Sequence, residues 1–286
     1  MKNFEYVNAP TLPDALKALD ALGERALLVA GGTNVMVYIR AGKRNDRTLV
    51  NIRDIQELKG ISLENGLVKI GALTTLADIA NSELLKENAP GLYAAGNVFA
   101  DPTTRNSATI GGNVANAGAG GDTIPSLMVL DAVAHLQNLQ GERAVKVCDL
   151  FTRPGKTVLL NNEILTYFTF KAEPHIGFMK LCMRKSMSIS MASAGAYIKL
   201  DHAGKVEDCR IALGAVAPTP VRAYHAEKTL IGKMFDDKVF DEVGEAVQSD
   251  INPRNPSVRA TVTYRRAVVP VLVKRACKLA AFGECQ

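Results

Sequence analysis

Tryptophan is missing from the sequence, and aromatic residues of all kinds make up only 6% of it. Proteins that bind single-stranded nucleic acid stack the bases on aromatic side chains, so this chain offers few such platforms. Excess positive charge is also modest, because 34 lysines and arginines oppose 29 aspartates and glutamates, a net charge of +5 with no dense basic run. We therefore expect no nucleic acid partner, whereas this charge is compatible with a small anionic ligand.

Closely spaced metal ligands are absent as well. The five cysteines form no CxxC pair, and the four histidines are at least 23 residues apart in the sequence. Zinc sites and iron–sulfur clusters usually take their ligands from such local groups, so we expect this chain to hold no metal. An odd number of dispersed cysteines is typical of reduced thiols in a cytosol.

Long apolar runs are lacking too. The run from Ala26 to Ala30 stops at two glycines, far short of the roughly 20 residues that a membrane-spanning helix needs. The first residues, Met1 to Glu5, contain no apolar core of a signal peptide. We expect a cytoplasmic protein with no membrane partner.

Length and composition are those of a globular protein. The chain has 286 residues, of which 47% are hydrophobic and 22% are charged, so we expect one large or two ordinary domains. In the N-terminal half, helical and extended patterns alternate, which places the chain in the α/β or α+β class. The predicted elements are a helix over 11–23, strands over 26–30, 49–52 and 66–72, and a helix beginning at Thr75, with the strand over 26–30 buried on both faces.

The pattern changes after residue 163. Four successive strands are predicted over 163–170, 177–184, 190–200 and 206–217, followed by helices over 239–247 and 257–281. Pro270 lies within the last of these and is expected to kink or divide it. We place a domain boundary near Glu173 and Pro174, where a strand ends in a proline.

Two glycine-rich stretches are the most informative feature. Gly31-Gly32-Thr33-Asn34 follows one apolar run, and Thr109-Ile110-Gly111-Gly112-Asn113 lies about 75 residues later. Backbone amides without side chains can approach a phosphate closely, so the two stretches together suggest a cradle for a diphosphate. The alternative is a pair of tight turns imposed by strand geometry alone.

Other nucleotide and hydrolase motifs fail. A Rossmann fingerprint beginning at Gly118 needs a third glycine where Thr123 stands, and a P-loop ending at Lys156-Thr157 needs a glycine where Leu150 stands. Ser193 has no nucleophile-elbow glycine before it and falls in a predicted strand. Hydrolase chemistry therefore has no support.

The segments Leu27 to Asn34 and Arg105 to Asn113, with the later Asp122 and the stretch Gly214 to Arg222, resemble the FAD-binding subunit of molybdenum hydroxylases. The resemblance covers nearly the whole chain and is greatest to the FAD subunit of bacterial xanthine dehydrogenases. It implies an α+β protein with a two-subdomain FAD-binding fold of the PCMH type, followed by a C-terminal domain of antiparallel sheet plus helices. The implied domains are residues 1–173, with subdomains of about 1–56 and 57–173, and residues 174–286, which are similar to the CO dehydrogenase flavoprotein C-terminal domain.

The resemblance also implies which residues bind FAD, and it assigns no catalytic residue. The first glycine stretch would wrap the diphosphate, the second would complete the cradle, and Asp122 would hydrogen-bond a polar part of the cofactor. Lys180 would lie near the flavin, where it could stabilise the anionic reduced form. The full set is Leu27, Leu28, Val29, Ala30, Gly31, Gly32, Thr33, Asn34, Phe99, Thr109, Ile110, Gly111, Gly112, Asn113, Asp122, Leu165 and Lys180.

The activity that the resemblance implies is electron transfer between subunits. An iron–sulfur partner with two [2Fe-2S] clusters would deliver electrons, a large molybdopterin-binding partner would oxidise xanthine, another purine or another N-heterocycle, and this chain would pass the electrons to NAD or another acceptor. The assembly would be a hetero-oligomer such as a heterotrimer or a dimer of heterotrimers. Two alternatives stay open: a stand-alone flavin oxidoreductase of the same fold, and a scaffold subunit without redox chemistry.

Overall fold

The structure, a computed structural model, describes residues 4–43, 46–184 and 186–283. Met1 to Asn3 and Cys285, which the sequence arguments used, lie outside the described residues. Within these residues, three larger sheets of different topology follow one another along the chain, and a fourth sheet has only two short strands.

The first sheet is a small parallel one, with strand order β1-β3-β2. Helix α1 covers it, with Leu16 and Leu19 buried and Thr11 capping the helix through a hydrogen bond from the Asp14 amide, as its sequence pattern predicts. The elements are β1 (Tyr6–Asn8), α1 (Leu12–Leu22), β2 (Ala26–Val29), α2 (Val35–Arg40) and β3 (Thr48–Asn51).

Strand β2 corrects one prediction. It was expected to be buried on both faces, but its four residues are only half buried, because β2 is an edge strand of the small sheet. Leu27 and Leu28 line a cavity, and Leu28 also packs against the core of the small sheet. The apolar side chains of β2 therefore line a ligand-sized cleft as well as contribute to a core.

The second sheet is antiparallel, with strand order β4-β5-β10-β6-β7, and short helices pack on one face of it. Its most buried helix is α8, all of whose residues are buried. The elements are β4 (Ile61–Glu64), β5 (Leu67–Gly71), α3 (Leu76–Ala80), α4 (Glu83–Asn88), α5 (Pro90–Asn97), α6 (Pro102–Arg105), α7 (Ile110–Ala115), α8 (Thr123–Val129), β6 (Val133–Asn138), β7 (Gly141–Lys146), β8 (Phe151–Arg153), β9 (Lys156–Thr157) and β10 (Ile164–Lys171).

The third sheet is antiparallel and four-stranded, in the order β11-β12-β13-β14, with helices over its outer face. The last helix was expected to be kinked or divided at Pro270. It is not divided: α11 is continuous, and it begins five residues later than expected, at Val262. The elements are β11 (Ile176–Leu181), β12 (Ala192–Leu200), β13 (Val206–Gly214), β14 (Val221–Arg222), α9 (Tyr224–Leu230), α10 (Val239–Ala246) and α11 (Val262–Phe282).

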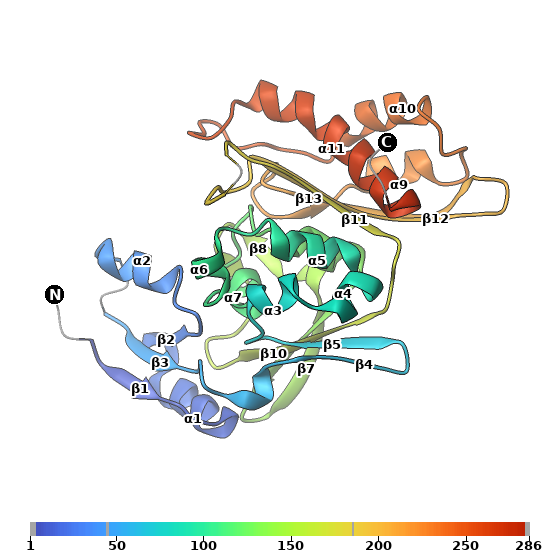
Figure 1. Cartoon of the computed structure of the whole chain (residues 1–286). Helices are drawn as coiled ribbons and strands as arrows, with labels where there is room; N and C mark the ends of the chain where they lie inside the picture. The colour runs from blue at the N-terminus through green and yellow to red at the C-terminus, as the bar shows by residue number, and fades with distance from the viewer. Residues whose placement is uncertain (1–3, 44–45, 185, 284–286) are drawn as a thin grey trace.

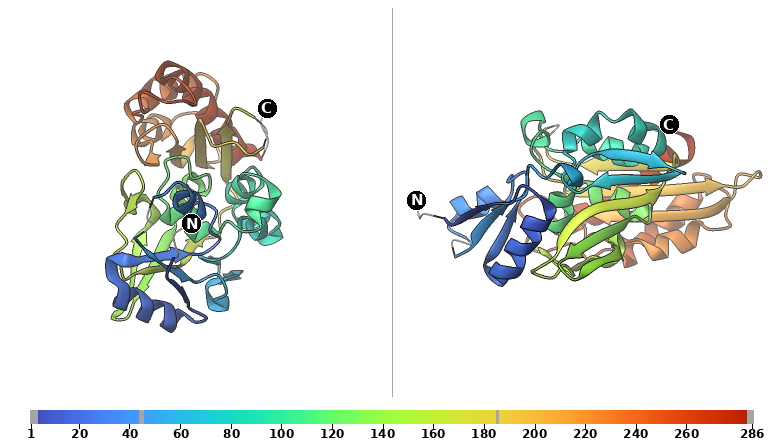
Figure 2. Two further views of the ribbon diagram at one scale, coloured as in Figure 1. Left: turned by 90° about the vertical axis from the view of Figure 1, so that its left-hand side faces the viewer. Right: turned by 90° about the horizontal axis from the view of Figure 1, so that it is seen from below.

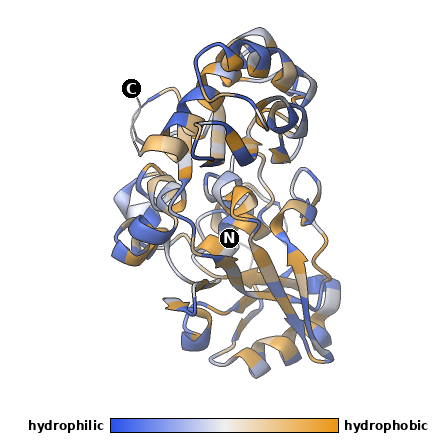
Figure 3. Cartoon of the chain, turned by 90° about the vertical axis from the view of Figure 1, so that its right-hand side faces the viewer, coloured by the Kyte–Doolittle hydropathy of each residue, from blue (hydrophilic) through white to orange (hydrophobic). Residues whose placement is uncertain are grey.

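The five-stranded and four-stranded sheets form two layers. Helices of the middle part, α5 and α8 among them, lie between the five-stranded sheet and the four-stranded sheet and contact the latter (Figure 1). The small parallel sheet sits at one end of the molecule, away from the C-terminal helices (Figure 2). The C-terminal helices carry hydrophilic as well as hydrophobic residues (Figure 3), and no helix within the described ranges is long and apolar enough to cross a bilayer. The predicted α+β class, with a C-terminal antiparallel sheet and helices, is confirmed.

Candidate functional site

The two glycine-rich segments lie against each other. A Cβ atom on Gly31 would stand 1.7 Å from the carbonyl oxygen of Ser107, so no larger residue fits while the segments keep this contact. Ser107 lies two residues before Thr109, at the start of the second segment. Segments about 75 residues apart in sequence therefore meet at this point.

The first segment leaves its backbone amides free. Among the described residues, none accepts a hydrogen bond from the amides of Gly31, Gly32, Thr33 and Asn34. Gly32 adopts a positive φ of 72°, which favours glycine and turns the chain between β2 and α2. We call these four residues the glycine loop. Unpaired amides in succession form a concave site for an anion.

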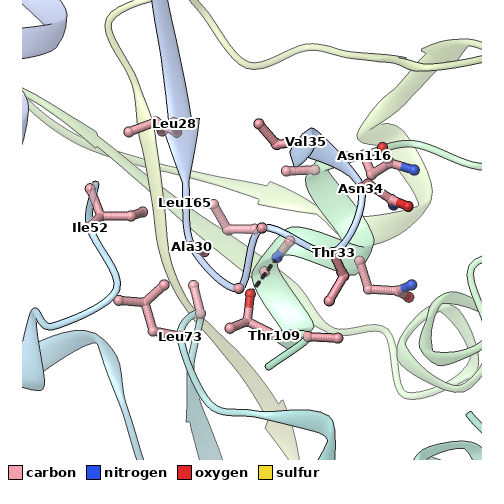
Figure 4. A pocket seen from close by; sticks show the side chains of 18 of the residues that line it. Leu28, Ala30, Thr33, Asn34, Val35, Ile52, Leu73, Thr109, Asn116 and Leu165 are labelled. Atoms are coloured by element: carbon pink, nitrogen blue, oxygen red, sulfur yellow. Dashed lines mark hydrogen bonds between the residues drawn. The ribbon is translucent and has the colours of Figure 1, made fainter. Parts of the chain in front are cut away.

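The second segment differs from the prediction, which treated it as a loop with amides available to a phosphate. Ile110 to Ala115 instead form helix α7, and its first amides are already used. Gly111 donates to the carbonyl of Ala72 over 2.8 Å, and Gly112 donates to the Thr109 hydroxyl over 3.1 Å (Figure 4). Thr109 thus accepts one hydrogen bond and keeps its own proton for a ligand.

The structural role of glycine at position 112 differs from its role at position 31. A Cβ atom on Gly112 would meet only the Thr109 hydroxyl, at 2.9 Å, and otherwise faces open space. The bare surface of Gly112 therefore belongs to the cavity. The second segment contributes the Thr109 hydroxyl, this bare surface and the Asn113 side chain.

A first cavity of about 240 Å³ lies between these segments (Figure 4). Its apolar end is lined by Leu28, Ile52, Leu73 and Leu165, and its polar end by the glycine loop. This layout suits a long ligand with a planar apolar end and an anionic middle. Of the predicted site residues it brings together Leu27, Leu28, Ala30, Gly31, Gly32, Thr33, Asn34, Phe99, Thr109, Gly111, Gly112, Asn113 and Leu165.

Four predicted residues, Val29, Ile110, Asp122 and Lys180, do not line this cavity. Val29 is on β2 but does not line the first cavity, which Leu28 and Ala30 on either side of it do. Ile110 is completely buried in the middle core. Sequence position placed Val29 and Ile110 in the motif, but their side chains point elsewhere.

A second, more open cavity of about 1120 Å³ continues from the first. Both are lined by Asn34, Tyr38, Phe99, Asn113 and Asn116, so a single extended ligand can occupy both. The second cavity also borders the segment Gly118 to Asp122 and, from the C-terminal part, residues near Ser190 and Ala215. It therefore lies where the middle and C-terminal parts meet.

Asp122 and Lys180 contact one another. The Lys180 ammonium lies 2.7 Å from the Asp122 carboxylate and also donates to the Val98 carbonyl over 3.1 Å. Ser190 donates to the second carboxylate oxygen over 2.6 Å. Burial raises the pKa of the Asp122 carboxyl, while Lys180 and Ser190 stabilise its ionised form. Asp122 lines the second cavity, but Lys180 lines neither cavity.

Sequence reasoning missed several lining residues. Tyr38 and Asn116 connect the two segments, since the Tyr38 hydroxyl lies 3.4 Å from the Asn116 amide oxygen. A signal existed for Asn116, which comes three residues after Asn113 and so falls on the same face of a short helix. Ser190 gave no signal, because its contact with Asp122 spans 68 residues.

Comparison with known proteins agrees with this geometry. The model of the FAD binding domain in molybdopterin dehydrogenase matches residues 2–170, and that of the CO dehydrogenase flavoprotein C-terminal domain matches residues 178–280. The chain belongs to this FAD-binding family. The xanthine dehydrogenase FAD-binding subunit of Escherichia coli O157:H7 is 34% identical over 275 residues, which cover 94% of this chain and 93% of that protein. The carbon monoxide dehydrogenase medium chain of Hydrogenophaga pseudoflava is 30% identical over 286 residues, 99% of this chain and 98% of the relative.

Solved structures share the fold over the whole chain. Carbon monoxide dehydrogenase from Hydrogenophaga pseudoflava superimposes with a TM-score of 0.92 at 30% identity, covering 100% of this chain and 99% of that one. Quinoline 2-oxidoreductase from Pseudomonas putida 86 gives a TM-score of 0.91 at 25% identity, with all of both chains covered. The predicted PCMH-type fold is therefore confirmed, and the chain is an FAD-binding component of an oxidoreductase.

The residues present fit FAD. The cofactor is a long molecule with two planar ring systems joined through a diphosphate, and the two contiguous cavities offer apolar walls on either side of four unpaired amides. When bound, FAD supplies the hydride and single-electron transfer chemistry. The task left to the protein is to bind, orient and tune the cofactor.

Proposed function

We propose that this chain is the FAD-carrying electron-transfer subunit of a molybdenum hydroxylase complex similar to xanthine dehydrogenase. It takes electrons from a partner subunit with two [2Fe-2S] clusters and passes them to NAD or another acceptor. A large molybdopterin-binding subunit oxidises the substrate, and the three form a heterotrimer or a dimer of heterotrimers. The single observation that carries this proposal is the row of unpaired glycine-loop amides beside an apolar cleft that opens into a second cavity.

In the proposed complex the glycine loop holds the diphosphate through its amides. The Thr109 hydroxyl and the Asn113 side chain donate from the opposite wall, and Gly112 permits close approach. Leu28, Leu165 and Phe99 contact the planar rings. Asp122 binds a polar part of the cofactor from the second cavity, and Lys180 acts through Asp122 by fixing its charge and position.

The relatives and the cysteines of this chain support the proposed substrate, subunit assembly, domain division and cellular location. The related subunits named for xanthine dehydrogenase support xanthine or another purine as the substrate of the complex, and the medium chains of other dehydrogenases among the relatives support the assembly with further subunits. Two domains, residues 1–173 and 174–286, agree with the gap between the two matched regions. The free state of Cys148, Cys182, Cys209 and Cys277 supports a cytoplasmic location.

The test is purification of the tagged full chain from its own host. We expect flavin absorbance bands and two copurifying proteins, one with iron–sulfur absorbance and one much larger with molybdopterin. Adding xanthine to this complex should bleach the flavin bands, and adding NAD should restore them with formation of NADH. The matched control is a complex carrying Gly112→Asp, in which FAD and electron transfer to NAD should be lost together.

Three results would contradict the proposal. Absence of flavin bands, even after FAD is supplied, would remove its basis. Turnover of substrate by the isolated chain would favour a stand-alone flavin oxidoreductase. Electron transfer that persists in the Gly112→Asp complex without FAD would favour a scaffold role.

A further inference from the structure

Two arginines on the wall of the second cavity have unpaired side chains. Arg254 and Arg259 lie in the segment between α10 and α11, and both line the cavity. Within the described ranges, neither guanidinium forms a hydrogen bond or an ion pair. Arg222, in contrast, is bound to Glu227, and Arg265 donates to the Met191 carbonyl and the Ser257 hydroxyl.

The charges around this cavity leave an excess of positive charge. Its charged lining residues are Asp101, Asp122, Arg254 and Arg259. The charge of Asp122 is already compensated by Lys180 at 2.7 Å. Among these residues, the negative charge of Asp101 alone therefore remains to balance the positive charges of two arginines. The Asp101 carboxylate accepts hydrogen bonds from the amide and hydroxyl of Thr104.

Arg259 lies close to the buried Arg265. Burial lowers the pKa of the Arg265 guanidinium, and the nearby charge of Arg259 lowers it further. The buried Arg265, 4% exposed, also fastens the chain at Ser257, between the two cavity arginines. This hydrogen bond anchors the backbone between Arg254 and Arg259, both of which line the cavity.

We propose that Arg254 and Arg259 form a binding site for the phosphate groups of an anionic electron acceptor, a pyridine dinucleotide, at the mouth of the second cavity. Planar guanidinium groups bind phosphate through paired hydrogen bonds. Asn252, Asn255 and Ser188 line the same cavity and offer further polar contacts. The diphosphate of FAD does not compete for this site, because the free amides of the glycine loop lie in the first cavity.

This inference rests on the proposed function, because it names the acceptor that the FAD subunit serves. It concerns binding; in the transfer itself the reduced cofactor loses two electrons and a proton, which pass as hydride to NAD and form NADH. The arginines should not increase the affinity for a neutral acceptor such as the quinone menadione, which has no phosphate group. The site should therefore discriminate between acceptors by charge.

The experiment uses the full chain loaded with FAD, whose flavin content is measured first. NAD is titrated into the wild type, into Arg254→Glu/Arg259→Glu and into the control Arg25→Glu/Arg53→Glu, with binding followed by calorimetry. The control residues are exposed and line neither cavity, so the control carries the same change of net charge elsewhere on the surface. In parallel, photoreduced protein is oxidised with menadione.

We expect the cavity variant to bind NAD about tenfold or more weakly than the wild type. Its affinity should also depend less on salt. The control variant should retain wild-type affinity, and oxidation by menadione should be equal in all three proteins. Inorganic pyrophosphate should compete with NAD in the wild type.

Equal NAD affinity in the cavity and control variants would overturn the inference, as would a parallel loss of menadione oxidation. Wild-type protein that contains FAD but binds neither NAD nor pyrophosphate would also overturn it, while leaving the FAD subunit assignment intact. Failure to retain FAD at all would instead count against the proposed function.

Discussion

The carboxylate of Asp122 and the ammonium of Lys180 lie 2.7 Å apart across the junction of the middle and C-terminal parts, with only 6% and 4% of their side chains exposed. Asp122 precedes helix α8, whereas Lys180 is on strand β11. One ion pair therefore joins the two parts beside the second cavity.

The substitution Lys180→Met tests how much this ion pair contributes to the free energy of unfolding. The substitution leaves a buried carboxylate without its counter-charge, which costs about 3–5 kcal/mol when a buried pair is broken. We expect a loss of that order in the free energy of unfolding, measured by urea denaturation. The double variant Lys180→Met/Asp122→Asn removes both charges and should recover a large part of the loss. A double variant as unstable as the sum of both single variants would show that the pair is not coupled.

Gly112→Asp and Gly112→Asn separate charge from bulk at the diphosphate. Both side chains have the same shape and disturb the Thr109 cap equally, because a Cβ atom lies 2.9 Å from its hydroxyl. We expect both variants to bind FAD more weakly than the wild type, with the aspartate at least about tenfold weaker than the asparagine.

The measurement is fluorescence quenching during titration of FAD into each purified full chain. The difference between the two variants should shrink as salt is added, because screening weakens the repulsion between the carboxylate and the diphosphate. Indistinguishable affinities for the two variants would mean that no phosphate lies near Gly112.

Glu163→Gln tests how acid affects the wall of the first cavity. Arg143 binds both oxygens of Glu163, over 2.6 and 2.8 Å, and together with the amide of Leu160 it lowers the pKa of this carboxyl from its ordinary value of 4.5. A lowered pKa in the folded state adds stability above pH 4.5, and that contribution disappears as the pH falls through the lowered value.

We therefore expect Glu163→Gln to be less stable than the wild type at neutral pH, with the gap closing below pH 4.5. Urea denaturation at a series of pH values measures this. Because Leu159, Ile164 and Leu165 next to this ion pair line the first cavity, FAD affinity should follow the same trend. Stability curves that stay parallel down to acid pH would contradict the explanation.

The sequence predicted the meeting of the two glycine-rich segments because both carry local signals, bare glycines after an apolar run and small polar residues behind them. It did not reveal that the first amides of α7 already donate hydrogen bonds within the protein. Glycine disfavours helices, so Gly111 and Gly112 were interpreted as loop residues, whereas the Thr109 cap and the Ala72 carbonyl hold the turn in helical form.

Contacts between distant residues that carry no local sequence signal could not be predicted from the sequence. The bond from Ser190 to Asp122 and the pairing of Asp122 with Lys180 depend on how the C-terminal sheet packs against α8. Periodicity also cannot distinguish a strand that faces a ligand cleft from one that faces a filled core, which is why β2 was expected to be fully buried. Pro270 fits inside α11 because tertiary packing outweighs the helix-breaking tendency of one residue.

The most direct test of the account is a crystal structure of the full chain with FAD bound. We expect the diphosphate oxygens to lie about 2.7–3.2 Å from the amide nitrogens of the glycine loop, with the bare face of Gly112 against them. The cofactor should extend through both cavities. FAD bound elsewhere, or a diphosphate that contacts none of the amides of Gly31 to Asn34, would contradict it.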